Sequence, residues 1–258
     1  MEMAPRLQVA VCVLWILMCT AGSVSELTYG LTSGTNGTSQ QDSTVRDCSD
    51  LPYGSPSGVY TIHPDRLTPT SAYCDMDDGK GWTVFQKRAD ILPRQDFFKD
   101  WEAYKWGLGS FDGEFWWGLH HLWQLTSQLD RVYELRVDLW DFENQTAYAI
   151  YQKFTIESED GDYRIDFGDY IGTAGDRFGL TYNKGMKFST FDRDNEPTSS
   201  NCSYLYQGAW WYSNCVWANL NGQYKPGVTG LTTVFWYDWR GYYSLNTTTM
   251  KIRPTNTL

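Results

Sequence analysis

Apolar and polar residues alternate most regularly over Tyr133–Leu139, so successive side chains there would lie on opposite faces of a sheet. Gly58–Ile62 and Trp82–Gln86 are rich in β-branched and aromatic residues and are bounded by Gly and Pro, which is typical of strands. Ala147–Ile156 offers a neighbouring strand. The pattern predicts an antiparallel sheet.

A helix is expected from Asp96 to Lys105, where apolar residues recur at helical spacing and Asp96 is placed to cap the first turn. The apolar face of this helix would carry Phe97, Trp101 and Tyr104. A second helix is expected near His120–Thr126. Strands and helices together predict an α+β domain.

The segment Asp176–Tyr224 shows no helical or strand periodicity and is dominated by Gly, Asn, Asp, Ser and Trp. A long irregular segment inside a compact domain usually has a function. Such a segment needs other means of holding its shape, and a disulfide and a metal ion are the candidates here.

The N-terminal residues 1–22 have the features of a secretory signal peptide, because Arg6 precedes an apolar run from Leu7 to Met18 that ends in small residues. Cleavage is expected between Gly22 and Ser25. The run is shorter than the ~20 residues that cross a bilayer, so no membrane span is expected. Residues 26–46 are rich in Ser, Thr, Gly and Asn and are expected to form a flexible leader.

Two of the six cysteines, Cys12 and Cys19, would be removed with the signal peptide. An even number then remains, as suits an oxidising extracellular compartment. Three disulfide pairings of the remaining four are open; a zinc site is less compatible because no CxxC pair occurs and histidines are few. The four cysteines are Cys48, Cys74, Cys202 and Cys215.

The formal net charge of −10 argues against nucleic acid as a partner. Aromatic residues make up 17% of the chain, which suits a large core and pockets with aromatic walls. Sequons that could carry N-linked glycans begin at Asn36, Asn144 and Asn246. A fourth, at Asn201, is less suitable because its middle residue is Cys202.

From residue 46 onward the chain resembles the fibrinogen C-terminal domain, the family of fibrinogen chains, ficolins, angiopoietins and tachylectins. The resemblance runs from Arg46-Asp-Cys to Ile252-Arg-Pro and predicts one domain over 47–254. The matching motifs include Ser57-Gly-Val-Tyr-Thr-Ile, Cys74-Asp-Met, Gly81-Trp-Thr-Val-Phe-Gln, Gly113-Glu-Phe-Trp, Leu135-Arg-Val-Asp-Leu, Ala174-Gly-Asp, Gly185-Met-Lys-Phe-Ser-Thr, Gly208-Ala-Trp-Trp-Tyr, Asn219-Leu-Asn-Gly and Met250-Lys-Ile-Arg-Pro.

This resemblance implies a small N-terminal subdomain, a central sheet with flanking helices, and a loop-rich subdomain that binds calcium and ligand. It also implies the local disulfide pairing, Cys48 with Cys74 and Cys202 with Cys215. The ligand stays open at this point, because family members bind acetylated sugars, peptides or receptors through variations on one surface.

A calcium loop is expected just before Cys202, where Asp192, Asp194 and Glu196 stand at alternate positions. Clustered oxygen ligands are what Ca²⁺ prefers. By resemblance, the metal would be bound by the carboxylates of Asp194 and Glu196 and by the carbonyls of Thr198 and Ser200. Glu196 departs from the aspartate that the family usually has, so a solvated acidic turn is the alternative.

The acetyl-binding members of the family imply a pocket with Tyr206 as one wall and the amides of a cis peptide between Asn214 and Cys215 as donors. Val216 replaces a histidine that is common in the family, and Trp217 stands beside it to compensate. A further family tyrosine is missing near Gly230. Tyr242 would supply the last wall, with Tyr243 as the alternative.

No enzyme is predicted. Asp192, Asp194 and Glu196 are crowded on one turn and cannot flank a scissile bond on opposite faces. The cysteines are expected to be oxidised, and His120-His121 falls in what looks like an ordinary helix rather than a pocket.

The sequence favours a secreted, calcium-associated lectin that recognises glycans, including acetylated sugars, on microbial surfaces in innate defence. The alternative is a protein-binding extracellular ligand of the angiopoietin or matrix type. A shallow sugar site binds weakly, and the leader has neither a collagen-like repeat nor a heptad. A homo-oligomer would therefore supply the avidity.

Overall fold

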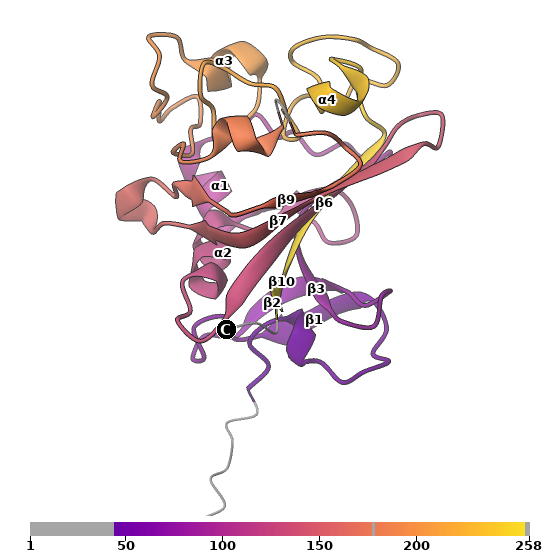
Figure 1. Ribbon diagram of the computed structural model, residues 1–258, viewed down its shortest axis with the longest axis vertical. Helices are drawn as coiled ribbons and strands as arrows, with labels where there is room; N and C mark the ends of the chain where they lie inside the picture. Colours follow the sequence, from indigo (N-terminus) through magenta and orange to yellow (C-terminus); the bar gives the residue numbers. More distant parts are fainter. Residues whose placement is uncertain (1–43, 177–178, 256–258) are drawn as a thin grey trace, which may run out of the picture. The chain divides into compact units, whose positions relative to one another are not determined.

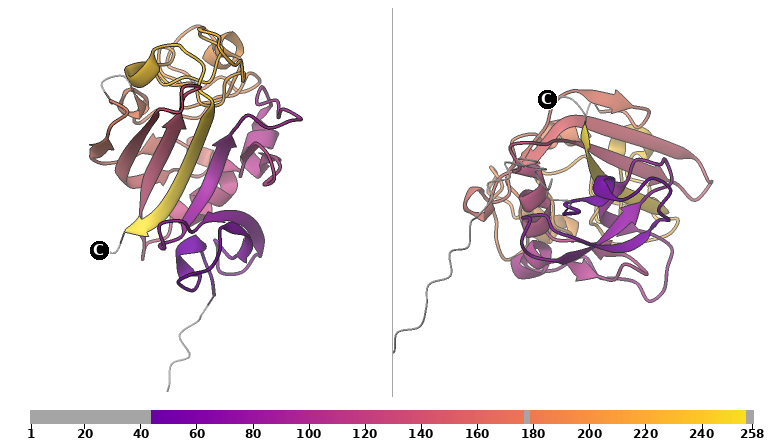
Figure 2. Two further views of the ribbon diagram at one scale, coloured as in Figure 1. Left: turned by 90° about the vertical axis from the view of Figure 1, so that its right-hand side faces the viewer. Right: turned by 90° about the horizontal axis from the view of Figure 1, so that it is seen from below.

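The computed structural model describes residues 44–176 and 179–255, and an antiparallel sheet runs through them. The main strand order is β1-β2-β3-β10-β6-β7-β8 (Figures 1 and 2). These strands are β1 (Gly58–Ile62), β2 (Thr70–Asp75), β3 (Trp82–Arg88), β10 (Thr247–Thr255), β6 (Val132–Trp140), β7 (Thr146–Ile156) and β8 (Ile165–Asp166). Three short strands pair beside them: β4 (Leu108–Gly109), β5 (Phe115–Trp116) and β9 (Tyr170–Gly172).

The C-terminal strand β10 lies between β3 and β6 and holds the two halves of the sheet together (Figure 2). Its pairing with β6 runs from Thr247 opposite Trp140 to Thr255 opposite Val132. The alternation predicted over Tyr133–Leu139 is confirmed, because the apolar residues of this segment are all buried. They are Tyr133, Leu135, Val137 and Leu139.

Helices α1 (Trp101–Trp106) and α2 (Leu119–Thr126) contribute to the core of the domain, and α2 packs against β7. Short helices α3 (Cys202–Tyr206) and α4 (Tyr237–Arg240) lie in the loops at one end of the sheet (Figure 1). Single 3₁₀ turns are η1 (Cys48–Asp50), η2 (Glu159–Gly161) and η3 (Leu180–Asn183). The predicted α+β class is confirmed.

The predicted start of the first helix at Asp96 is wrong. Asp100 caps this helix, because its side chain accepts a hydrogen bond from the backbone nitrogen of Ala103 at 3.0 Å. Asp96 instead accepts from the nitrogen of Phe98, two residues on, in a local turn that precedes the helix. Both aspartates suit a cap, and burial does not distinguish them, because Phe97, Trp101 and Tyr104 are all buried.

Both disulfides have the implied pairing, Cys48 with Cys74 and Cys202 with Cys215. The predicted signal peptide, most of the leader and Asn36 lie outside the described residues. Ordered contacts begin before the predicted boundary at residue 47, since the carbonyl of Val45 accepts from the nitrogen of His63 at 2.8 Å. Within residues 44–176 and 179–255, no helix has the length and apolar content to cross a membrane.

Candidate ligand-binding site

A buried ion pair anchors the loop-rich end of the domain to the sheet. Arg88 of β3 and Glu114 lie 3.0 Å apart, and both side chains are almost completely buried. The Arg88 guanidinium also donates to the carbonyls of Leu220 and Gly222 at 3.0 and 2.7 Å. Burial lowers the pKa of Arg88, but Glu114 opposes this shift, and arginine starts far enough above neutrality to stay charged. The pair therefore fixes the segment around Leu220 against the sheet.

Asn219 connects several loops at a single buried point. Its Oδ1 accepts from the hydroxyl of Tyr212 at 3.1 Å, while its Nδ2 donates to the carbonyl of Tyr206 at 3.1 Å and to that of Thr233 at 3.3 Å. Asn219 is fully buried, so these hydrogen bonds replace those to water that it has lost. Asn219 thus sets the position of Tyr206.

The Cys202–Cys215 disulfide joins the start of α3 to the predicted pocket segment, with the two Cα atoms 5.6 Å apart. Helix α3 is capped by Asn201, whose side chain accepts from the nitrogen of Tyr204 at 2.8 Å. The peptide bond between Asn214 and Cys215 is cis. Asn214 is exposed, and its carbonyl accepts from the hydroxyl of Tyr182 at 3.3 Å.

Four rings form a continuous series beside Asn214, and we call them the aromatic row: Tyr182, Trp217, Tyr237 and Tyr242. Ring centroids lie 6.3 Å apart for Tyr182 and Trp217, 4.8 Å for Trp217 and Tyr237, and 4.9 Å for Tyr237 and Tyr242. The rings of the row are only partly buried. The aromatic row can therefore offer apolar ring faces and polar hydroxyls to a ligand.

Burial raises the pKa of the Tyr242 hydroxyl, and Tyr237 and Tyr206 raise it further. Tyr242 is therefore neutral at physiological pH and can donate a hydrogen bond to a ligand oxygen. Tyr243, the alternative wall, points elsewhere, with its hydroxyl 3.4 Å from Glu143.

Tyr237 links Trp217 to Tyr242 within the row, although no motif in the sequence points to it. Its backbone nitrogen donates to the carbonyl of Trp217 at 3.0 Å, so the start of α4 is held against the predicted pocket segment. The sequence prediction therefore missed a central ring of the site.

Val216 was predicted to line the pocket, and its side chain is only 5% exposed. It packs into the hydrophobic core of the domain. Val216 therefore offers a ligand little surface, and the neighbouring Trp217 carries the exposed ring of this segment.

The acidic loop before Cys202 divides into two parts. Asp192 is tied to the rest of the domain, because it accepts from the hydroxyl of Thr190 at 2.6 Å and from the nitrogen of Trp101, at the start of α1, at 3.1 Å. Asp194 accepts from the nitrogen of Glu196 at 3.3 Å. Asp192 therefore anchors the loop to α1 through its hydrogen bonds, although both Asp192 and Asp194 are exposed.

The carboxylate of Glu196 is suited to act as a ligand to a cation. Its Oε1 accepts from the nitrogen of Ser203 at 3.3 Å, whereas its Oε2 is buried and has no hydrogen-bond partner in the described part of the chain. Among the described residues, no three His, Cys, Asp or Glu side chains converge on a metal position. A cation here would be held by Asp194 and Glu196 together with main-chain oxygens, for which Thr198 and Ser200 are the predicted sources.

The histidine pair lies in α2 as predicted, but the expectation that it avoids a pocket is wrong for His121. That ring lines a cavity of about 450 Å³ together with Trp106 and Trp117. Burial lowers the pKa of His121, and its Nδ1 lies 3.4 Å from Oε1 of Gln124. The cavity forms where Trp106, at the end of α1, packs against the start of α2.

The sequons differ in their surroundings. Asn144 is exposed in the turn between β6 and β7. Asn246 is half-buried, and its Oδ1 accepts from the hydroxyl of Tyr224 at 3.0 Å. Asn201 uses its side chain as the α3 cap. Asn144 is therefore the described sequon best placed to carry a glycan.

The family model for the C-terminal globular domain of fibrinogen beta and gamma chains matches residues 44–255. The chain belongs to the fibrinogen C-terminal domain family. Fibrinogen C domain-containing protein 1 of Xenopus tropicalis is 45% identical over 221 residues, which cover 81% of this chain and 47% of the frog protein. The chain thus spans about half the length of that relative.

Solved structures support the same family assignment. The fibrinogen-like globe domain of human ANGPTL6 is 37% identical, with a TM-score of 0.75 over 83% of this chain and 96% of that one. The lamprey fibrin D-dimer, solved with the peptide ligand Gly-His-Arg-Pro-amide, is 32% identical, with a TM-score of 0.75 over 87% of this chain and 80% of that one. This fibrinogen-related chain therefore has the fold that its sequence motifs imply.

Proposed function

We propose that this fibrinogen-related protein is a secreted lectin that binds glycans, including acetylated sugars, on microbial surfaces. The observation that carries the proposal is the aromatic row beside the exposed Asn214. Sugar rings and acetyl methyl groups stack on aromatic faces, while a few fixed polar groups orient them. The row supplies the faces, and Asn214 and the Tyr242 hydroxyl supply polar groups.

The pocket chemistry differs from that of acetyl-binding relatives at one wall. Val216 is buried and apolar, so the polar edge of the usual histidine is lost. Tyr237 lies between Trp217 and Tyr242 and supplies a ring with a hydroxyl in this region. We therefore expect a preference for glycans that can accept hydrogen bonds from tyrosine hydroxyls.

The proposal includes secretion of the protein, and it does not include nucleic acid as a partner. Two disulfides join the described cysteines, and disulfides persist in oxidising compartments such as the extracellular space. The formal charge of −10 would repel a polyanion.

Capture of a protein is the second candidate function. It is favoured by exposed apolar side chains on α3, Tyr204 and Leu205, beside Phe191 of the acidic loop. Phe98 joins this group, with its ring centroid 4.8 Å from that of Phe191. The lamprey fibrin D-dimer, a structural relative, was solved with a peptide ligand.

Binding to microbial surfaces tests the lectin proposal. We expect free sugars to compete with this binding, and Tyr206→Ala to weaken it about tenfold, or about 1.4 kcal/mol, because one proposed aromatic wall of the site is lost. Tyr53→Ala is the control, since Tyr53 is exposed in the N-terminal part of the domain. Binding that no sugar displaces, with capture of a cell-surface protein instead, would favour the second candidate.

Calcium is the proposed cofactor, and its effect on stability can be measured. At a Ca²⁺ concentration of about 100 times Kd, binding to the folded state adds about 2.7 kcal/mol to the free energy of unfolding. We expect the melting temperature to rise with Ca²⁺ and to fall again on chelation. Asp194→Asn should abolish this response.

Asp192→Asn is the matched control for the calcium experiment, because the Asp192 carboxylate already accepts hydrogen bonds from Thr190 and Trp101. We expect it to lower the melting temperature but to keep the rise with Ca²⁺. A wild-type protein that does not respond to millimolar Ca²⁺ would remove the ion from the proposed function.

A further inference from the structure

Leu129 stands out on the surface of the domain. It lies in the turn between α2 and β6, and its side chain is 99% exposed. A single exposed leucine is common in proteins. This one, however, adjoins two cavities in the surface of the same chain.

The first cavity, of about 560 Å³, is formed by Leu129 with Pro64, Trp123 and their neighbours. The second, of about 470 Å³, is formed by Leu129 with Val132, Lys153 and their neighbours. Leu129 lines both, so it is an apolar projection between two hollows. Each hollow is larger than a leucine side chain.

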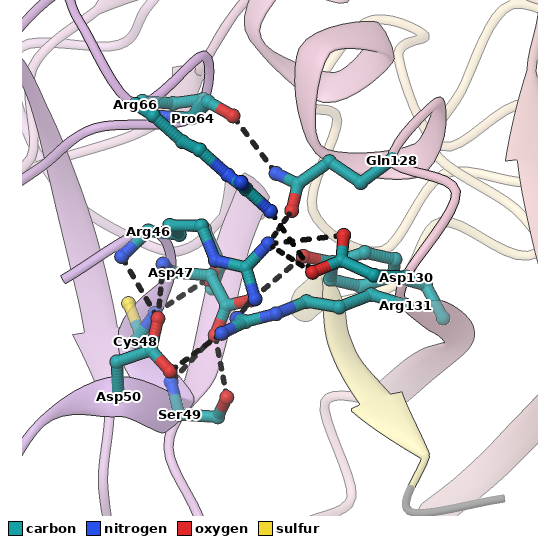
Figure 3. A network of polar contacts seen from close by, with 12 residues as sticks. Arg46, Asp47, Cys48, Ser49, Asp50, Pro64, Arg66, Gln128, Asp130 and Arg131 are labelled. Carbon is teal, nitrogen blue, oxygen red and sulfur yellow. Dashed lines mark hydrogen bonds and ion pairs between the residues drawn. The ribbon is translucent and has the colours of Figure 1, made fainter. Parts of the chain in front are cut away.

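The polar residues on either side of Leu129 are fixed to the domain (Figure 3). Gln128 donates to the carbonyl of Pro64 at 2.8 Å and accepts from Arg46 at 2.8 Å. Asp130 pairs with Arg46 at 2.8 Å and with Arg66 at 2.9 Å. The turn is therefore rigid before any partner arrives, which reduces the entropy lost on binding.

The charges around the two cavities nearly cancel. Their linings contain two acids, Asp65 and Asp130, and three bases, Arg66, Arg131 and Lys153. The whole chain, in contrast, has a formal charge of −10. Two copies of the chain would repel each other at most surfaces, but they can meet here without a strong like-charge penalty.

We infer that this surface, which we call the Leu129 face, joins two copies of the chain. Leu129 of each copy inserts into a cavity of the other. A two-fold interface uses the same patch on both subunits, so projection and hollow must lie side by side on one chain. The Leu129 face meets this condition.

The Leu129 face and the aromatic row lie at opposite ends of strand β6. Strand β6 begins at Val132, next to this face, and ends at Trp140. The carbonyl of Trp140 accepts a hydrogen bond from the nitrogen of Asn246, which follows Tyr242 of the aromatic row by four residues. Nine strand residues span roughly 27 Å. The dimer thus carries its two aromatic rows at opposite ends, suited to bridging two surfaces.

Two of the described sequons, Asn144 and Asn246, leave the Leu129 face free. Asn144 and Asn246 lie at the Trp140 end of β6, where Trp140 pairs with Thr146 and Thr247. Glycans on these asparagines would extend from the end opposite to the contact.

The test is the molar mass of the secreted full-length protein by size-exclusion chromatography with light scattering. We expect a dimer for the wild type, a monomer for Leu129→Asp, and weaker dimerisation for Leu129→Ala. Leu92→Asp, a matched change at a leucine that is 79% exposed, should leave the dimer intact. Because Leu129 is exposed, its variants should stay folded and keep the wild-type circular dichroism spectrum.

A monomeric wild type would overturn the inference, as would an oligomer that Leu129→Asp leaves unchanged. The bridging role rests on the proposed function and has its own readout. Leu129→Asp should abolish agglutination of microbial cells while each chain still binds sugar. Loss of sugar binding in Tyr206→Ala with an intact dimer would separate the two sites.

Discussion

Glu114→Gln is expected to lower the free energy of unfolding by about 3–5 kcal/mol, because it leaves the buried Arg88 without its counter-ion. The two carboxylate oxygens of Glu114 accept from Arg88 at 3.0 Å and from the nitrogen of Gln95 at 3.1 Å. Glutamine offers one oxygen, so its amide group would face one of these donors. The loss would be measured by urea unfolding.

The control for Glu114→Gln is Asp166→Asn, which makes the same change of carboxylate to amide at an exposed pair with Lys184. Exposed ion pairs contribute about 0–1 kcal/mol, so this variant should stay near the wild type. Equal stability losses in the two variants would show that the Arg88 pair does not anchor the loops.

Asn219→Ala is expected to lower the free energy of unfolding by about 2–4 kcal/mol, because it leaves the Tyr212 hydroxyl and the carbonyls of Tyr206 and Thr233 unpaired in the core. It should also weaken sugar binding, since Tyr206 loses the contact that positions it. Urea unfolding and a binding titration on the folded variant measure the two effects separately.

Asn183→Ala is the matched control for Asn219→Ala. Asn183 is also fully buried, but neither polar atom of its side chain has a hydrogen-bond partner among the residues that the structure describes. Its removal should therefore cost less stability and leave sugar binding unchanged. Identical losses in both variants would contradict the special role of Asn219.

The local elements could be predicted because their periodicity is local. The alternation of Tyr133–Leu139 defines one face of β6, and burial follows it. The helix start was misplaced because Asp96 and Asp100 suit a cap equally well. The position of β10 between β3 and β6 has no local signal, since Thr248 pairs with both Arg88 and Leu139.

The site was only partly predictable. Tyr206, Trp217 and Tyr242 came from the family resemblance, whereas Tyr237 was missed because four aromatic residues crowd Phe235–Trp239 and nothing local says which one is exposed. Arg88 and Asn219 could not be assigned, because a polar residue in sequence does not reveal its buried partner. For Asn219, the family motif Asn219-Leu-Asn-Gly was the one feature of the sequence that pointed to this position.

A glycan array of the wild type and Trp217→Ala, run with and without Ca²⁺, tests recognition through the aromatic row most directly. The expected result is binding of the wild type to a defined set of glycans that free sugar inhibits, with binding lost in Trp217→Ala. The contradicting result is a folded wild type that binds no glycan, or binds the same set as Trp217→Ala with equal strength.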